Sequence, residues 1–240
     1  MSNPRHGDRH RKCAGGLGHN PAIVCGHIAE PRFHVVGPMR RLLLLALLLV
    51  FAHPAFALTD AETAAVKKAE ATLNAITTMK ARFVQVDADG SSHEGDLYLS
   101  RPGKMRLVYD PPTPMLMVAD GVFLIYVDKE MDDVSHVDLN DTPAGLLLKQ
   151  NLSFGDPAVK LLGVHLGPGT VEITAAQAKD PAAGRLTFVF SDNPFEMRQW
   201  RVVDAQNKEV QVTLLNPSFG GALDGKLFRY DARREKSDRE

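Results

Sequence analysis

The sequence predicts an α+β fold, in which a strongly curved antiparallel sheet, or unclosed β-barrel, is covered by a lid of short helices. Three observations predict it. About eleven short segments after residue 80 alternate apolar with polar residues, as strands with one buried face do. An amphipathic helical segment precedes them, and two short leucine-bearing helical segments interrupt them. So many half-apolar strands bury their apolar faces most economically when the sheet curves and helices cover it.

The first 57 residues differ in composition from the rest of the chain. Met39-Arg40-Arg41, the apolar run 42–51 and Ala55-Phe56-Ala57 are typical of a signal peptide, so we expect residues 39–57 to be a signal peptide cleaved after Ala57. The run is too short to span a bilayer, which takes about 20 helical residues. We interpret residues 1–38 as an artefact of the assigned start site, with Met39 as the true initiator; a disordered extension before the signal is the alternative. The expected exported domain is residues 58–240.

This expected domain is acidic and has no cysteine. Both cysteines of the chain, Cys13 and Cys25, precede it, so its stability must come from its apolar core rather than from disulfides. Residues 1–57 hold seven of the 28 basic and two of the 29 acidic side chains, which leaves 21 and 27 and a net charge of −6. This balance excludes a basic nucleic-acid-binding surface, and solubility accounts for it.

A helix is predicted at Asp60–Thr77, before the first strand. Thr59 and Glu62 have the spacing of a capping box, in which the threonine caps the helix and the glutamate bonds back to the cap. Four apolar residues at helical spacing form the stripe that would pack on the sheet: Val66, Ala69, Leu73 and Ile76. The stripe is only weakly apolar, so we expect the helix to lie on the sheet without being held tightly.

Six strands follow in series, and the short turns between them predict an antiparallel meander. The clearest turn signals are Arg101-Pro102-Gly103 and Ala119-Asp120-Gly121, each between two alternating or apolar runs. The six runs are 81–86, 97–99, 105–109, 115–118, 122–127 and 134–139.

The middle of the chain predicts two short helices. Thr142 as N-cap with Pro143 in the first turn predicts a helix at Ala144–Lys149, and Asp156-Pro157 predicts another at residues 156–162. These helices would cover one mouth or face of the sheet. Five further strands are expected after them: Val171–Ala175, Arg185–Phe190, Met197–Asp204, Val210–Leu215 and Leu223–Tyr230.

Nothing after residue 57 has the pattern of a catalytic or metal site. The three histidines, His93, His136 and His165, have no metal-ligand spacing, and there is no GxSxG motif, phosphate-binding glycine loop or cysteine nucleophile. The acidic residues near positions 132 and 140 are typical of solvated loops. We therefore expect no enzymatic activity, no metal and no cofactor.

Several segments, in their order along the chain, resemble the family of periplasmic outer-membrane lipoprotein carriers, LolA. They are the leading helix, Ala81-Arg82-Phe83-Val84-Gln85, Gly95–Lys104, the Tyr109–Pro112 turn, the Val118–Gly121 turn and Thr142-Pro143. The most specific part is the Arg-Pro step after a G-D-L-x-L strand, with an A-D-G turn 18 residues later. The resemblance covers nearly all of residues 58–240. It implies an unclosed antiparallel barrel with a helical lid over an apolar space that receives the acyl chains of a lipoprotein.

The resemblance also implies roles for single residues. The arginine of the Arg-Pro step, here Arg101, would hold the lid closed through hydrogen bonds to backbone carbonyls, and the lid would contain Ala144–Lys149. The residues alone favour an ordinary solvated arginine at a strand end, and the resemblance reverses that preference. Twelve apolar residues are expected to line the acyl-chain cavity as a set, although sheet core also explains each one singly: Met79, Phe83, Leu97, Leu99, Met105, Leu107, Met115, Met117, Phe123, Leu146, Leu147 and Leu148.

We therefore expect a monomeric periplasmic carrier that binds the acyl chains of triacylated lipoproteins and transfers them from the inner to the outer membrane. The resemblance implies two partners besides this cargo: an inner-membrane ABC transporter of the Lol system, and a receptor on the outer membrane or that membrane itself. Two alternatives stay open. One is a periplasmic module of the same fold that binds another lipid or a glycolipid, or senses mislocalised lipoproteins, and the other is a structural domain whose sheet is fully packed.

Overall fold

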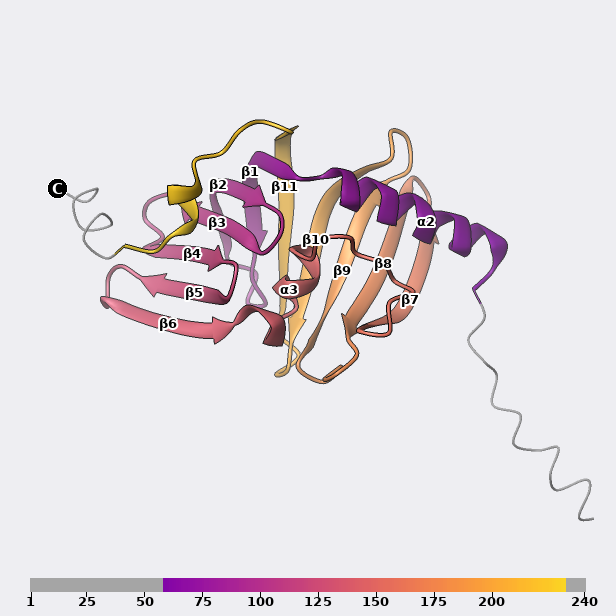
Figure 1. The fold of residues 1–240 in the computed structure, drawn as a ribbon. Helices are drawn as coiled ribbons and strands as arrows, with labels where there is room; N and C mark the ends of the chain where they lie inside the picture. Colours follow the sequence, from indigo (N-terminus) through magenta and orange to yellow (C-terminus); the bar gives the residue numbers. More distant parts are fainter. Residues whose placement is uncertain (1–57, 232–240) are drawn as a thin grey trace, which may run out of the picture. The chain divides into compact units, whose positions relative to one another are not determined.

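The computed structural model describes residues 58–231, and Figure 1 shows their fold. Eleven antiparallel strands form one sheet, in the order β6-β5-β4-β3-β2-β1-β11-β10-β9-β8-β7. The expectations for residues 1–38 and for the signal peptide at 39–57 lie outside the described residues. Within residues 58–231, no helix has both the length and the apolar character that crossing a membrane requires.

The first half of the sheet is the predicted meander. Each strand pairs antiparallel with the next, and the turn at Arg101-Pro102-Gly103 joins β2 to β3. The prediction of six strands in series is therefore confirmed. They are β1 (Thr78–Val86), β2 (Ser92–Ser100), β3 (Lys104–Tyr109), β4 (Met115–Asp120), β5 (Phe123–Asp128) and β6 (Asp133–Asp138).

The second half is a meander of five strands that joins the first half through its last strand. β11 pairs with β1, with Phe83 opposite Leu214, and β6 and β7 remain as the two edges. The sheet therefore curves without closing, and the predicted fold class is confirmed. The five strands are β7 (Val159–Gly167), β8 (Thr170–Gln177), β9 (Gly184–Ser191), β10 (Glu196–Asp204) and β11 (Glu209–Phe219).

The helix α2 (Asp60–Ala75) is the predicted one, although it ends two residues before Thr77. The Glu62 N–H donates to Thr59 Oγ1 at 3.2 Å and the Thr59 N–H donates to Glu62 Oε2 at 2.7 Å, so the capping box is confirmed. All four residues of the predicted stripe are buried. The helix contacts β7 and β10, and Figure 1 shows it crossing the second half of the sheet.

Between the two edge strands lie η2 (Leu139–Asp141), α3 (Ala144–Leu147) and a loop to Ala158; we call residues 139–158 the lid segment. The expected N-cap of α3 is wrong. Pro143 has the N-cap position, and the Thr142 hydroxyl donates to the Leu139 carbonyl at 2.9 Å. A threonine hydroxyl bonds readily to a carbonyl three residues earlier, so Thr142 ends η2 instead of starting α3.

The second predicted helix, at residues 156–162, is wrong, because β7 begins at Val159. Asp156 opens a turn: its Oδ1 accepts the Ala158 N–H at 2.9 Å and its carbonyl accepts the Val159 N–H at 2.8 Å. From Val159 onward the chain is extended and pairs with β8. An Asp-Pro step is compatible with a turn as well as with a helix start, and the neighbouring strand decides between them.

The predicted strand at Leu223–Tyr230 is also wrong. The short helix η3 (Gly225–Phe228) takes this place, and Asp224 Oδ1 accepts the Lys226 N–H at 2.9 Å. The apolar residues of this segment have another role than strand formation: Phe228 is buried, and Tyr230 packs on the outer face of the sheet. The outer apolar cluster under Tyr230 consists of Leu116, Val118, Ile125 and Val127.

Candidate functional site

An open cavity of about 780 Å³ lies on the inner face of the sheet. Its walls come from β3, β4 and β5 on one side and from β10 and β11 on the other, and α3 covers it. This volume lies within the range of about 300–1,000 Å³ that small-molecule sites have. Most of the lining is apolar and includes Leu107, Met117, Leu124, Leu147, Trp200 and Val212.

The structure divides the residues expected to line such a cavity. Five of the twelve line it: Met105, Leu107, Met115, Met117 and Leu147. Six others are buried in the adjoining core and are not part of the wall: Met79, Phe83, Leu97, Leu99, Leu146 and Leu148.

The expectation for Phe123 is wrong. Its side chain is 41 % exposed and lies beside His136, with the ring centroids 6.1 Å apart. Leu124 and Tyr126 line the cavity in its place. Successive residues of a strand point to opposite faces, and the run 123–127 is apolar on both faces because the outer face is also covered. The sequence of this run therefore does not determine which of its residues face the cavity.

Sequence reasoning missed the wall formed by β10 and β11. Trp200, Val202 and Val212 line the cavity, and Trp200 lies opposite Val212 across the two strands. The same-face pair Trp200/Val202 is visible in the sequence. Its position opposite β3–β5 follows only from the pairing of β11 with β1, which joins residues far apart in the chain.

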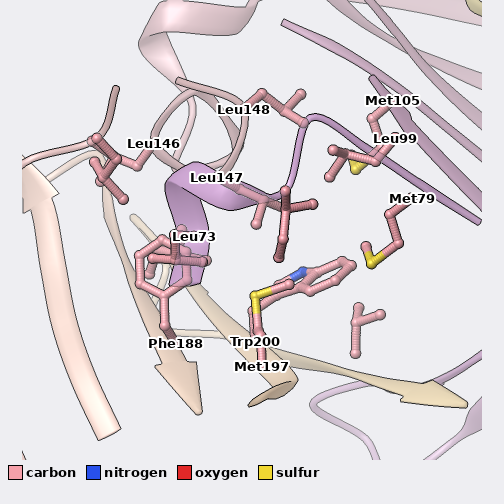
Figure 2. Close-up of a cluster of buried hydrophobic side chains, with 14 of the residues drawn as sticks. Leu73, Met79, Leu99, Met105, Leu146, Leu147, Leu148, Phe188, Met197 and Trp200 are labelled. Carbon is pink, nitrogen blue, oxygen red and sulfur yellow. The ribbon is translucent and has the colours of Figure 1, made fainter. Parts of the chain in front are cut away.

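Leu147 is the leucine of α3 that faces the cavity. Figure 2 shows Leu147 and Met79 pointing toward Trp200 from two sides. Leu146 and Leu148, on either side of Leu147, are buried in the core. Because α3 has only four residues, it places only Ala144 and Leu147 against the cavity.

Arg101 bonds to α2 and not to α3, the helix that sequence reasoning expected it to hold. Its Nη1 donates to the Leu73 carbonyl near the end of α2, and its backbone N–H donates to the Thr77 carbonyl at 2.8 Å. Its Nε and Nη2 are buried and have no hydrogen-bond partner within residues 58–231. Burial lowers the pKa of the Arg101 guanidinium to about 10, so it is still a cation at neutral pH.

Gly103 ties the same turn to the lid segment. Its N–H donates to the Leu148 carbonyl at 3.0 Å. Its φ is +76°, and a Cβ at this position would lie 2.9 Å from the Cα of Gly121, so the turn requires glycine. Through Arg101 and Gly103, the β2–β3 turn is bonded to both elements that cover the inner face.

Two side chains of α2 also bond to the lid segment directly. Asn74 forms a pair of hydrogen bonds with the backbone of Leu152, donating at 2.9 Å and accepting at 2.8 Å. Glu70 Oε1 accepts the Ser153 hydroxyl at 2.9 Å and the Phe154 N–H at 2.5 Å. Glu70 and Asn74 are one helical turn apart, so one face of α2 holds three successive residues of the lid segment.

Polar side chains gather at the edge of the cavity where β1 and β3 end and β2 begins. The Tyr109 hydroxyl donates to Gln85 Oε1 at 2.7 Å, and Gln85 Nε2 donates to Asp87 Oδ1 at 2.7 Å. His93 continues the chain, with Nε2 3.3 Å from Asp87 Oδ2 and Nδ1 2.9 Å from Thr113 Oγ1. We call these five residues the polar rim.

The rim is acidic. Asp128 at the end of β5 and Asp204 at the end of β10 also line the cavity, and no lysine or arginine is among the described residues that do so. Burial raises the pKa of the Tyr109 phenol, and the Asp87 carboxylate raises it further. Burial also raises the pKa of the Tyr126 phenol. Both phenols therefore stay neutral donors beside the carboxylates.

Within residues 58–231, no three His, Cys, Asp or Glu side chains come close enough together to ligate a metal ion. The arrangement supports the binding of an apolar molecule with a polar end: hydrocarbon surface inside, hydrogen-bonding groups at the rim, and a short helix as cover.

The chain is similar to known proteins over most of the described residues. Residues 74–231 match the family described as outer membrane lipoprotein carrier protein LolA. The outer-membrane lipoprotein carrier protein of Pseudomonas aeruginosa is 28 % identical over 179 residues, which is 71 % of this chain and 85 % of that protein. The protein of the same name from Legionella pneumophila is 38 % identical over 101 residues, 40 % of this chain and 47 % of that one. A solved structure of a LolA superfamily protein from Nitrosomonas europaea covers 72 % of this chain and 99 % of its own, at 8 % identity and a TM-score of 0.41.

Proposed function

The chain belongs to the outer membrane lipoprotein carrier protein LolA family, and from this premise we propose that it carries lipoproteins through the periplasm with their acyl chains in the inner-face cavity. The observation that supports this most is the cavity itself, about 780 Å³ with mostly apolar lining and a four-residue helix as cover. Each methylene that leaves water for such a space contributes about 0.8 kcal/mol, so acyl chains are the ligand that gains most from it.

A carrier also has to release its cargo, and the geometry of Arg101 suits a cover that opens. A hydrogen bond from a charged group to a carbonyl contributes about 1.5–3 kcal/mol, whereas each buried donor without a partner costs about 1–3 kcal/mol. Arg101 combines one bond to Leu73 with two buried nitrogens that lack partners. These opposing contributions favour the closed state but leave it able to open. We therefore propose Arg101 as the latch between the β2–β3 turn and α2.

Family membership also supports the other parts of this proposal. In this proposal the protein binds triacylated lipoproteins as cargo. It receives them from an inner-membrane ABC transporter of the Lol system and delivers them to an outer-membrane receptor or to the outer membrane itself. The signal peptide at residues 39–57 would deliver the chain to the periplasm, where it would act as a monomer.

Depletion of the protein tests the carrier function. We expect lipoproteins of the outer membrane to accumulate in the inner membrane, and triacylated proteins to be recovered with the carrier when it is isolated from the periplasm and analysed by mass spectrometry. Unaltered sorting overturns the carrier function. Unaltered sorting together with a different lipid in the isolated protein would support the alternative, a lipid- or glycolipid-binding or lipoprotein-sensing module of the same fold.

A further inference from the structure

Tyr126 places a hydroxyl without a partner between the apolar interior and the polar rim. On β5 it lies opposite Met117, one row further in than Asp128, which lies opposite Met115. Its side chain lines the cavity, and its hydroxyl has no hydrogen-bond partner among the described residues. A half-buried donor of this kind leaves a hydrogen bond for a bound molecule to complete.

The depth of this hydroxyl indicates which atom would complete the bond. Leu107 and Met117 lie level with Tyr126 across the strands, Met105 and Leu124 form the next row inward, and the rim lies on the other side of Tyr126. A ligand with alkyl chains inside therefore presents to Tyr126 the atoms at which those chains are attached. In an acylated molecule these are ester or amide carbonyl oxygens, which accept a hydrogen bond from a neutral phenol.

The charges at this edge of the cavity disfavour a ligand whose polar end is anionic. Asp87, Asp128 and Asp204 line the cavity, and no cationic lysine or arginine among the described residues joins them there. A carboxylate or phosphate at this edge would lie among like charges in a partly desolvated place, which disfavours it. An uncharged acyl-glyceryl end avoids this repulsion.

Resting on the proposed function, we propose that this edge is a headgroup subsite, where Tyr126 donates to the ester or amide carbonyls of an uncharged acyl-glyceryl-cysteine and the three carboxylates reject anionic lipids. The apolar wall contacts alkyl chains only, so it cannot distinguish a lipoprotein from a phospholipid with the same chains. The three carboxylates of the subsite supply that distinction, because they disfavour the anionic phosphate.

Trp200 provides the readout, because it is the only tryptophan of the chain and lines the cavity. The protein isolated from the periplasm and freed of lipid is titrated with a tripalmitoyl-glycerylcysteinyl peptide and with dipalmitoylphosphatidylglycerol, and binding is followed by tryptophan fluorescence. Wild type should bind the peptide more tightly. Tyr126→Phe should weaken peptide binding about three- to tenfold, the value of one hydrogen bond. It should weaken any binding of phosphatidylglycerol as well, because that lipid has the same ester carbonyls.

The matched control is Tyr98→Phe. Tyr98 lies on the outer face of β2, where Lys80 Nζ is 5.5 Å from its ring centroid, and its substitution should change neither affinity. In the opposite direction, Asp128→Asn should tighten binding of phosphatidylglycerol several-fold without affecting the peptide. Asparagine keeps the Oδ1 acceptor that Asp128 uses toward the N–H groups of Glu130 and Met131, so this variant retains its turn.

The outcomes separate the two proposals. If wild type binds neither lipid, the proposed function fails. If wild type binds the peptide but Tyr126→Phe and Tyr98→Phe behave alike and Asp128→Asn leaves phosphatidylglycerol binding unchanged, the headgroup subsite is overturned and the carrier function stands.

Discussion

The inner face of the sheet is covered in two ways, with opposite results. Beneath α2 and the loop that follows α3 it is filled: Phe188 is fully buried, and its ring packs edge to face against that of Phe154 in the lid segment, 6.0 Å between centroids. Beneath α3, strands of the same alternating pattern surround the cavity of about 780 Å³. We call these regions the packed side and the hollow side.

The difference arises from the covers and not from the strands. The sixteen residues of α2 bury Ala69 and Leu73 completely, and a small residue such as Ala69 lets the helix approach the sheet closely. The four residues of α3 place one leucine over the cavity. Alternation along a strand determines which side chains point inward. The length and shape of the covering helix determine whether those side chains pack against it or border a cavity.

The largest expected effect contrasts the two sides directly. Phe188→Ala on the packed side should lower the free energy of unfolding by about 3–5 kcal/mol, because the residue is fully buried and its neighbours cannot collapse into the space. Met117→Ala on the hollow side should cost about 1 kcal/mol or less, because this side chain already borders an open volume. Urea denaturation of both variants measures the contrast.

Equal losses for Phe188→Ala and Met117→Ala would contradict the distinction between the two sides. The lipid-free protein has to be used in both measurements, since a ligand in the cavity would stabilise wild type and enlarge the apparent loss at Met117.

The second effect concerns the junction between the two covers. Asn74→Ala removes both bonds to the Leu152 backbone and leaves a part-buried N–H and carbonyl unpaired, at a cost of about 1–3 kcal/mol. The loss should be local, so hydrogen exchange should accelerate in residues 148–158 and stay unchanged in β8 and β9. The matched control is Thr72→Ala, because the Thr72 hydroxyl bonds only within α2, to the Lys68 carbonyl. Uniform acceleration across the domain would mean that Asn74 supports the whole fold and does not link the two covers.

A smaller effect on stability is expected at the proposed latch. Arg101→Leu loses the bond to Leu73 and also removes two buried nitrogens without partners, so the two contributions offset to within about 1 kcal/mol. The cover should nevertheless open more often, with faster exchange of the Gly103 amide, which donates to the Leu148 carbonyl. Transfer of bound lipoprotein to acceptor membranes should change accordingly. If Arg101→Leu shows the same exchange of the Gly103 amide and the same lipoprotein transfer as wild type, Arg101 is not the latch.

The parts that sequence reasoning predicted well are those that local residues determine. The capping box of Thr59 and Glu62 and the meander of β1–β6 depend on neighbours in the chain. Residues 159–162 are strand because β8 lies beside them, which no local pattern contains. Likewise, the partner of Arg101 on α2 and the wall at Trp200 depend on how distant segments come together. The phase error at Phe123 has another cause, since both faces of β5 are apolar.

The smallest expected effect is on the pH dependence of the cover on the hollow side. Lys149 Nζ donates to Asp156 Oδ2 at 2.5 Å and thereby joins the end of α3 to the turn before β7. This bond and, after it, the Ala158 N–H hold the pKa of the Asp156 carboxyl below its ordinary value of 3.8. In the unfolded chain the carboxyl therefore binds its proton at higher pH than in the folded one.

The stabilisation from Asp156 is accordingly complete above about pH 4 and is lost as the pH falls through the lowered pKa. Its size is small, because an exposed ion pair is screened by water. Asp156→Asn should lower the urea midpoint slightly at pH 6 and reduce the fall in midpoint below pH 4. Asp133→Asn is the control, since the Asp133 side chain has no ion pair or hydrogen bond within the described part of the chain. The same curve for both variants would mean that the Lys149–Asp156 pair does not hold the cover, and that the hollow side is closed by Gly103 and by the contacts of Asn74 and Glu70 with residues 152–154.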